Sequence, residues 1–164
     1  MGEQGADRQT LPNGGPILGV VGSQFGGAVL QQSANRRLTA LPGSEWTFRI
    51  DEPEPKGRGV IAPLSVIQRG NIIAYMSENG FYELGAPSRP IGAERIDDTM
   101  LSTIDLSRIN EIQGALDPVN KLYVWLVPSN SAAAGTFDQL WIYNWYLGDN
   151  GHPRPWSFAE VSIQ

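Results

Sequence analysis

The sequence predicts a mainly β fold of antiparallel four-stranded units with one short helical insertion. Three observations predict this fold class: the apolar runs are short, residues that favour turns separate them, and one segment departs from the strand pattern. The 19 Gly and 12 Pro follow no Gly-X-Y period, which excludes collagen and indicates frequent turns. With 41% hydrophobic and 18% charged residues, the composition also excludes an intrinsically disordered chain.

The 164 residues are expected to form one β-rich domain, residues 17–164, preceded by an arm. A chain of this length buries roughly 70% of its unfolded surface on folding, which is enough for a core. Residues 1–16 are polar, rich in Gly and without apolar periodicity, so we expect an extended arm there. Two interpretations of the arm remain open: a frayed terminus, or a segment that packs on a neighbouring subunit.

The first two units are predicted at residues 17–50 and 60–92, where each apolar run has the length of a strand. The turn Ser77-Glu78-Asn79-Gly80 is a strong hairpin signal, because Asn and Gly tolerate positive φ. Residues 52–59 include two prolines and no apolar residue, so we expect them to connect one unit to the next. The strands are expected at 17–21, 25–30, 37–41, 46–50, 65–68, 72–76 and 81–84.

Residues 97–110 interrupt the strand pattern with a helical insertion. Asp97-Asp98-Thr99 can cap a helix at its start, and apolar residues follow at helical spacing. We therefore predict a short helix near 99–104 and a second helical turn over 105–110. The apolar residues of the helix are Met100, Leu101 and Ile104.

The third unit is predicted at residues 111–163. Its clearest feature is the turn Asp117-Pro118-Val119-Asn120, in which Pro presets φ and Asp accepts a backbone N–H. This turn should join paired strands at 112–116 and 122–127. The runs 121–127 and 140–145 are apolar on both faces, so we expect both surfaces of these strands to be covered. Loops are expected at 128–137 and 147–155, and a closing strand at 156–163.

Three units of about four strands correspond to the blades of a β-propeller. A propeller usually has about four to eight blades, so three would form part of a ring. The alternative is that the units stack as a sandwich. A partial ring would be completed by a homo-oligomer or by partner chains, and we expect the arm and the loop 128–137 to reach those contacts.

The charge and composition narrow the classes of partner. Seventeen carboxylates against 12 Lys and Arg give a net charge of −5, so direct nucleic-acid binding is disfavoured. Ten of the 12 cations are Arg, whose planar guanidinium suits ion pairs at interfaces. The chain has no Cys and hence no disulfide or thiolate site. Without a signal-like start or an apolar run near ~18 residues, it is expected to be neither secreted nor membrane-spanning.

The residue inventory does not predict an enzyme. The chain has one His and lacks the nucleophile-elbow, zinc-protease and phosphate-loop motifs. We interpret His152, between Gly151 and Pro153, as an exposed loop residue, because no orienting partner or pocket is indicated nearby. The sequence therefore predicts no catalytic, cofactor-binding or metal-ligating residues, and no cofactor.

Neighbouring carboxylates are candidates for catalytic pairs or metal ligands. Asp51 with Glu52, Glu52 with Glu54, and Asp97 with Asp98 are too close in sequence to face one another across a substrate. We interpret the first group as a solvated connection and the Asp97-Asp98 pair as a helix start that the dipole favours. Asp149-Asn150-Gly151 lacks the alternating carboxylates of a calcium loop, so a turn is the better interpretation.

Aromatic residues concentrate in the third unit. Packing between units is favoured, because alternate strand residues point into each face and aromatic rings bury large areas there. A carbohydrate-stacking surface is the alternative, so a glycan stays among the possible partners. The residues are Trp125, Trp141, Tyr143, Trp145, Tyr146 and Trp156.

The order of the motifs along the chain resembles a known pattern. Gly14-Gly15-Pro16 begins it, Ala115-Leu116-Asp117-Pro118 lies in its later part, and Trp156-Ser157 ends it. Between them lie the motifs at 17–22, 36–38, 59–68, 76–82, 89–92, 119–122 with Trp125, and 140–145. Together they resemble a group of bacteriophage virion proteins with propeller-like β-structure, similar in style to the tail hub, nozzle or DNA-stabilisation proteins of tailed phages.

This resemblance, which covers nearly the whole chain from Gly14, implies a function. It implies a structural component of the phage particle, in the tail or neck, that is made in the host cytoplasm and acts through contacts with other virion subunits. The alternative is a carbohydrate- or host-receptor-binding β-module of a phage tail.

Overall fold

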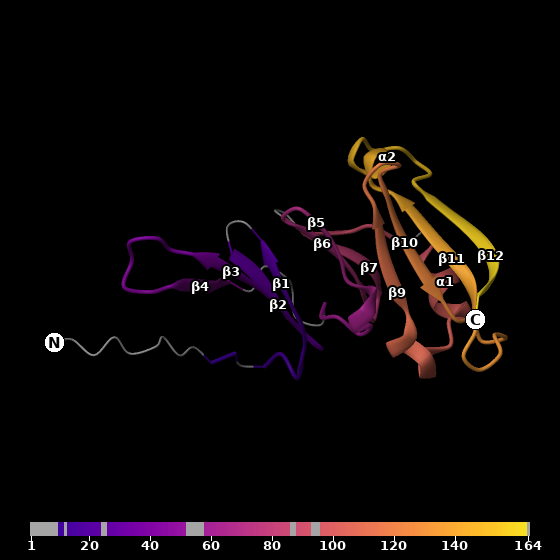
Figure 1. The fold of residues 1–164 in the computed structure, drawn as a ribbon, viewed down its shortest axis with the longest axis horizontal. Helices are drawn as coiled ribbons and strands as arrows, with labels where there is room; N and C mark the ends of the chain where they lie inside the picture. The colour runs from indigo at the N-terminus through magenta and orange to yellow at the C-terminus, as the bar shows by residue number, and fades with distance from the viewer. Residues whose placement is uncertain are drawn as a thin grey trace.

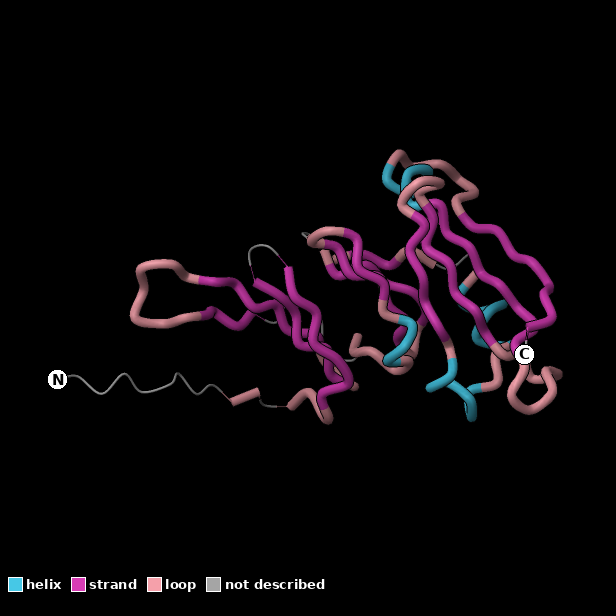
Figure 2. Tube along the Cα trace, viewed as in Figure 1, coloured by secondary structure: helices cyan, strands magenta, loops and turns pink. Residues whose placement is uncertain are grey.

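A computed structural model describes residues 10–11, 13–23, 26–51, 58–85, 88–92 and 96–163 of the chain. Within these residues the strands form three antiparallel sheets of four strands each, and hydrogen-bonded neighbours in a sheet are consecutive in sequence. Figure 1 shows the sheets one after another along the long axis of the molecule. Figure 2 shows how little of the described chain is helical. The predicted mainly β fold of antiparallel four-stranded units is confirmed.

The first sheet contains β1 (Ile17–Ser23), β2 (Gly26–Gln31), β3 (Asn35–Ala40) and β4 (Phe48–Asp51), close to the predicted unit 17–50. The hairpin of β3 and β4 projects away from the rest of the chain (Figure 1). The end of the predicted arm lies on the turn after β2, where the Ser33 N–H donates to the Gly14 carbonyl at 3.0 Å. Residues 1–9 and 12 of the arm, and the predicted connection at 52–57, lie outside the described residues.

The second sheet contains β5 (Ile67–Arg69), β6 (Ile72–Ser77), β7 (Gly80–Leu84) and β8 (Arg89–Pro90). The strand predicted at 65–68 begins only at Ile67, because a 3₁₀ turn, η1 (Pro63–Ser65), precedes it. Pro63 favours this turn, and the Ser65 hydroxyl closes it by donating to the Ala62 carbonyl at 2.7 Å. The predicted turn before Gly80 joins β6 to β7 as expected.

The third sheet contains β9 (Gln113–Asp117), β10 (Leu122–Val127), β11 (Phe137–Asn144) and β12 (Trp156–Ile163). The hairpin prediction is confirmed, because β9 and β10 pair from Asp117 opposite Leu122 onward. The Asp117 carboxylate accepts from the backbone N–H groups of Val119 and Asn120, each at 3.0 Å. These bonds fix the turn locally.

One prediction for the third unit is wrong. Residue 145 was expected at the end of a strand and residues 147–149 in a loop, but both belong to a helix, α2 (Trp145–Asp149). Asn144 causes the change, because its side-chain oxygen accepts from the Leu147 N–H at 3.0 Å and caps the helix. The predicted loop 128–137 also ends one residue early, since β11 begins at Phe137. That loop is held by its own chain, where Arg108 donates to the carbonyls of Ala133 and Thr136.

The helical insertion consists of α1 (Asp97–Thr103) and a 3₁₀ segment, η2 (Leu106–Glu111). A short helix followed by a second helical turn was predicted here, with bounds that differ by one or two residues. The predicted cap is wrong: the N-cap residue is Ile96 and makes no side-chain capping bond. The carboxylate of Asp97 instead accepts from the Phe81 N–H of β7 at 3.3 Å. Asp97 therefore connects the helix to the second sheet, a contact that local sequence does not encode.

The second sheet is buried on both faces. Along β6, Ile73 and Tyr75 pack in a core against the first sheet, and Ala74 and Met76 pack in a second core against the third sheet and α1. Strand residues alternate between faces, so each face of this sheet fills a different core. Among the described residues, a core covers one face of the strands expected at 122–127 and 140–145. Alternate residues of β10 and β11 there are only half-buried and belong to neither core.

The first strands of the three sheets lie next to one another. The Gln68 side chain on β5 donates to the Gly22 carbonyl of β1, and β5 contacts β9. Gly114 permits the second approach, because a Cβ atom there would lie 2.5 Å from the Ser65 carbonyl oxygen. This order matches that of innermost strands in adjacent propeller blades. The described residues thus form an open series of three blade-like sheets.

Candidate functional site

The aromatic residues of the third unit pack mainly between the second and third sheets. Trp125, Trp141 and Tyr143 are buried, and Trp156 packs against the same core. The Phe81 ring of β7 lies 4.3 Å from that of Trp125, centroid to centroid. Packing is therefore confirmed as the role of these four side chains. Two residues differ: the Trp145 side chain is half-buried, and Tyr146 is 51% exposed.

The candidate acid–base residues have structural contacts. His152 is exposed, and its Nδ1 accepts from the Arg154 N–H at 3.1 Å within the same loop. Asp51 pairs with Arg49 at 3.0 Å on the surface, and Glu52 and Glu54 lie outside the described residues. Asp98 is exposed, whereas its neighbour Asp97 is buried. The structure does not bring Asp97 and Asp98 together on one cleft.

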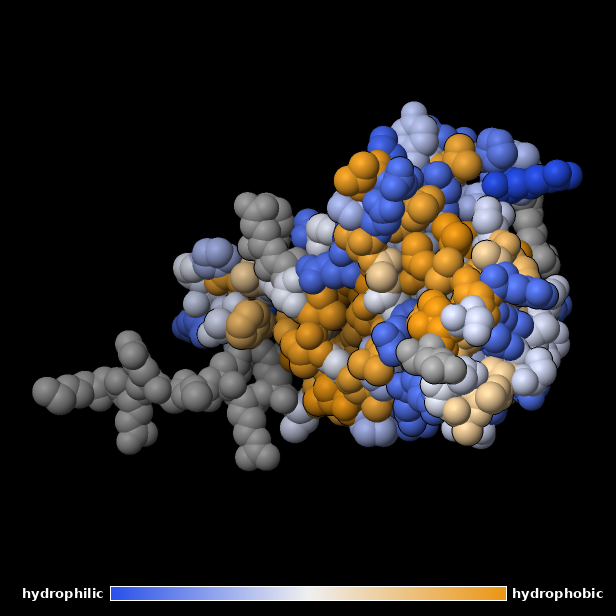
Figure 3. All heavy atoms as spheres, turned by 45° about the vertical axis from the view of Figure 1, so that its right-hand side comes forward, coloured by the Kyte–Doolittle hydropathy of each residue, from blue (hydrophilic) through white to orange (hydrophobic). Residues whose placement is uncertain are grey.

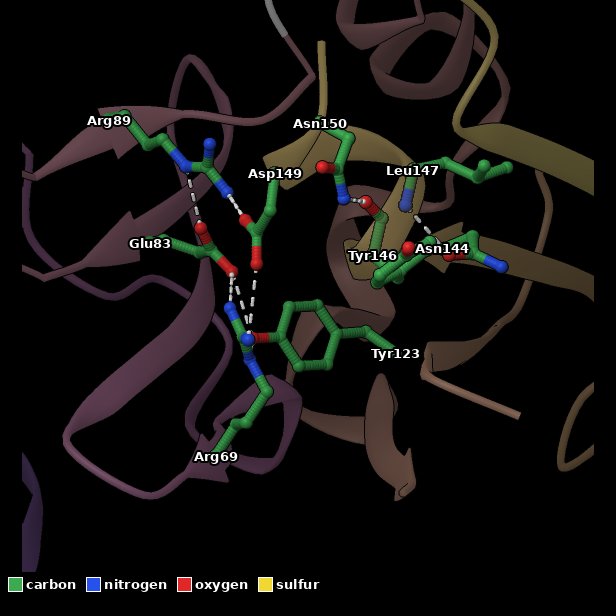
Figure 4. A network of polar contacts seen from close by, with 9 residues as sticks. All are labelled: Arg69, Glu83, Arg89, Tyr123, Asn144, Tyr146, Leu147, Asp149 and Asn150. Carbon is green, nitrogen blue, oxygen red and sulfur yellow. Dashed lines mark hydrogen bonds and ion pairs between the residues drawn. The ribbon is translucent and has the colours of Figure 1, made fainter. Parts of the chain in front are cut away.

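A network of charged groups joins the second sheet, the third sheet and α2 (Figure 4). The Glu83 carboxylate of β7 lies at its centre, where Oε1 accepts from the Tyr123 hydroxyl at 2.8 Å and from Arg69 at 3.3 Å. Its Oε2 accepts from Nε of Arg89 at 2.8 Å. Asp149 of α2 accepts from Arg69 at 3.2 Å and also pairs with Arg89. Two carboxylates and two guanidinium groups balance in charge.

The environment of the network changes the pKa of its members. Burial and the negative charge of Glu83 raise the pKa of the Tyr123 hydroxyl, while Arg69 acts in the opposite direction. Burial also raises the pKa of Tyr143 to about 12. For Arg69, burial acts to lower the pKa, but the hydrogen bond to Tyr123 and the charges of Tyr123, Asp149 and Glu83 raise it on balance. These tyrosines stay neutral, and Arg69 stays cationic, through neutral pH.

The network holds α2 in place. The Arg69 guanidinium lies 4.2 Å from the ring centroid of Trp145, and the Lys121 ammonium lies 4.3 Å from that of Tyr146. Both cations thus contact aromatic rings of the helix while Asp149 pairs with the second sheet. Because its members bond one another across β7, β10 and α2, the network connects the second and third sheets.

Sequence reasoning missed this network, although one signal could have found it. Glu83 is an acidic residue inside the predicted strand 81–84, where its neighbours are apolar. An acidic side chain on a strand covered on both faces must be paired, because an isolated buried charge is very costly. Asp149, predicted to lie in a turn, supplies the second carboxylate at the end of α2.

Two cavities lie beside the stacked sheets. One of about 420 Å³ lies between the first two sheets, beside Arg37, which donates to the Gly85 carbonyl. The other, of about 640 Å³, has a mainly aliphatic lining from the end of the arm and the helical insertion, with Glu78 as its carboxylate. The mainly aliphatic lining of this cavity suits contact with an apolar group.

The outer face of the third sheet is an apolar surface, and we call it the third-sheet face. Its residues share one side of the sheet by register, are half-buried and belong to neither core: Leu122, Val124, Leu126, Leu140, Ile142 and Ala159. The side of the molecule drawn in Figure 3 carries a broad gathering of hydrophobic residues. A contiguous apolar surface of this kind is typical of an interaction site.

The outer face of the first sheet is also apolar, and we call it the first-sheet face. Val20 and Phe48 are exposed there by 69% and 42%, and Leu38, Ala40 and Ile50 lie on the same side by register. The opposite side of this sheet packs on the second sheet through Ala28 and Leu30. Both ends of the stack therefore present apolar strand faces.

No protein-family model matches the chain, and no curated protein matches its sequence. The described helices include none that is both long and apolar enough to cross a membrane. Among the described residues, no three His, Cys, Asp or Glu side chains are placed to hold a metal ion. The two end faces of the stack are the candidate functional surfaces of the described chain, because each presents apolar strand residues that belong to neither core.

Proposed function

We propose that this chain is a non-enzymatic structural component of a bacteriophage particle, in the tail or neck, and that it acts through contacts with other subunits. The observation that carries the proposal is the open series of three blade-like sheets with an apolar face at each end. Proteins normally cover apolar sheet faces, so such a series is suited to assembly with further sheets. The order of the motifs resembles that of phage virion proteins, and this resemblance indicates that the assembly is a phage particle.

The contacts of the candidate side chains support this proposal. The charged network and the buried aromatic residues stabilise the packing of the sheets, which is the task of a structural subunit. The carbohydrate-binding alternative depended on accessible aromatic rings in the third unit. Because Trp125, Trp141 and Tyr143 are buried, that surface lacks its main residues, and we do not propose it.

Purified particles provide the test of this function. We expect quantitative mass spectrometry of washed particles to detect the chain at a fixed ratio to the major structural proteins. Deleting residues 2–13 should reduce its incorporation and leave the β-type circular dichroism spectrum unchanged. If the chain is absent from particles, or if the isolated chain binds glycans on an array without assembling, the proposed function is wrong.

A further inference from the structure

We propose that copies of this chain join head to tail, with the third-sheet face of one copy packed on the first-sheet face of the next. The proposed function requires contacts with other subunits, and this inference identifies one such subunit as a second copy of the chain. It rests on the proposed function only in assuming that the chain assembles. The occupant of each end face is thus a second copy of the same chain.

The first argument is continuity with packing that the chain already contains. The first and second sheets join face to face through apolar residues such as Leu30 and Tyr75, and the second and third sheets join through Phe81 and Trp125. In both cases the next sheet in the series covers the outer face of the sheet before it. A second copy added in the same order places its first sheet on the third-sheet face.

The second argument is the chemistry of the two faces. Val124 and Ile142 lie opposite each other at the middle of the third-sheet face, and Leu126 and Leu140 form the next pair. These β-branched and aliphatic side chains resemble the residues that the internal cores bury. On the other end, Val20 is 69% exposed although it lies on a strand, which is an unfavourable position for a valine unless another surface covers it.

The third argument is charge. By register, Arg36 is the charged strand residue on the first-sheet face, where it is buried and donates to Gln31. The other charged strand residues, Arg37, Arg49 and Asp51, lie on the opposite side of the sheet, with Ala28.

The strands of the third sheet carry no Lys or Arg, and two of their carboxylates, Asp117 and Asp138, lie on the side of the third-sheet face. Their third carboxylate, Glu160, lies opposite Gln139 on the other side. Two third-sheet faces brought together would place the carboxylates of Asp117 and Asp138 near one another, and like charges disfavour a contact between like ends.

Contact between two different surfaces is heterologous, so it forms a closed ring or an open filament and not a symmetric dimer. This property makes the proposal testable with two variants that each disable one face. Val124→Asp places a charge on the third-sheet face, and Val20→Asp places one on the first-sheet face. Val119→Asp is the control, because Val119 is 84% exposed in the turn after β9 and lies on neither face.

Analytical ultracentrifugation of the full chain should show a ring or filament for the wild type and for Val119→Asp. Each face variant alone should be a monomer, with association at least about tenfold weaker, because a carboxylate would be buried without a partner. An equimolar mixture of the two face variants should form a dimer and nothing larger, because each variant keeps one intact face. Circular dichroism must show the same β spectrum for all variants.

A second measurement does not depend on the aspartate variants folding. Since the chain has no Cys, the single variants Val124→Cys and Val20→Cys can be mixed under oxidising conditions. The expected product is a disulfide between Val124→Cys of one copy and Val20→Cys of another. Homodimers of each variant in place of this product would overturn the proposal, and so would a wild-type monomer or a symmetric dimer.

These outcomes separate the inference from the proposed function. A chain that is present in particles but stays monomeric when purified overturns the head-to-tail contact and leaves the structural function standing. A head-to-tail oligomer that is absent from particles supports the contact and removes the phage function.

Discussion

Replacing Glu83 with Gln tests whether the charged network clamps the second and third sheets together. The substitution keeps the size of the side chain and removes the charge that both Arg69 and Arg89 pair with. Glu83 is 2% exposed, so water cannot replace the lost carboxylate. We expect a large decrease in the free energy of unfolding with no change of fold.

The magnitude follows from the geometry of the pairs. Removing one partner of a fully buried ion pair costs about 3–5 kcal/mol. The Arg69 and Arg89 side chains are 19% and 37% exposed, and Asp149 remains as a counter-ion for both, so solvent and this second carboxylate reduce the loss. We therefore expect a decrease of about 2–3 kcal/mol, or about 5–10 °C in Tm for a chain of this size.

Urea and thermal unfolding, followed by circular dichroism, provide the assay. Asp51→Asn is the matched control, because it breaks an ion pair with Arg49 whose members are 41% and 62% exposed. That change should cost less than about 0.5 kcal/mol. A Tyr123→Phe variant, alone and combined with Glu83→Gln, should reveal a coupling energy of about 1 kcal/mol. If Glu83→Gln is as stable as the control, the network does not clamp the sheets.

Three further changes test other contacts. Gly80→Ala should lower the free energy of unfolding in urea by about 2 kcal/mol, because the φ of Gly80 is +118° and a Cβ there would lie 2.2 Å from the Asp97 carboxylate. Gly22→Ala is the control and should be neutral, because a Cβ at Gly22 would lie within 4 Å of no described residue other than its chain neighbours. Burial raises the pKa of Tyr143 from 10.0 to about 12, so the neutral hydroxyl contributes fully to the free energy of unfolding below pH 10, and this contribution is lost as the pH rises to 12. Tyr143→Phe should therefore lose less stability than the wild type between these pH values. An unchanged dependence of stability on pH would contradict this prediction. Hydrogen bonds from Asn120 and then Val119 lower the pKa of Asp117 below 3.8, so Asp117→Ala should lower the Tm at neutral pH. The difference in Tm from the wild type should vanish as the pH falls below 3.8 and the carboxylate becomes protonated. Equal Tm values at pH 7 would refute this prediction.

The sequence by itself determined the strands and turns whose stabilising contacts are local. The turn after β9 is closed by Asp117 bonding to residues two and three positions later, so its type can be deduced from four residues. The hairpin that turns at Gly80 is likewise closed between neighbouring residues, where Ser77 pairs with Gly80. Locally encoded features of this kind determined the fold class and the division into three units.

Where two local rules compete, the sequence allows two outcomes. Trp145 continues an apolar run, which favours a strand, but Asn144 offers a helix cap, and the cap prevails in the structure. Asp97 could cap α1 by sequence, yet its carboxylate bonds to β7. The first outcome follows from a local cap, whereas the second follows from the position of the neighbouring sheet.

Tertiary structure alone decided the charged network and the two end faces. Glu83 and Tyr123 are 40 residues apart, and Arg69 and Asp149 are 80 apart, so their pairing depends on how the second and third sheets stack. The apolar residues of β10 were predicted to be covered on both sides, but coverage depends on whether another sheet comes next in the stack. Burial and ion pairing between distant segments are properties of the packed sheets, whereas turns and caps are properties of a few consecutive residues.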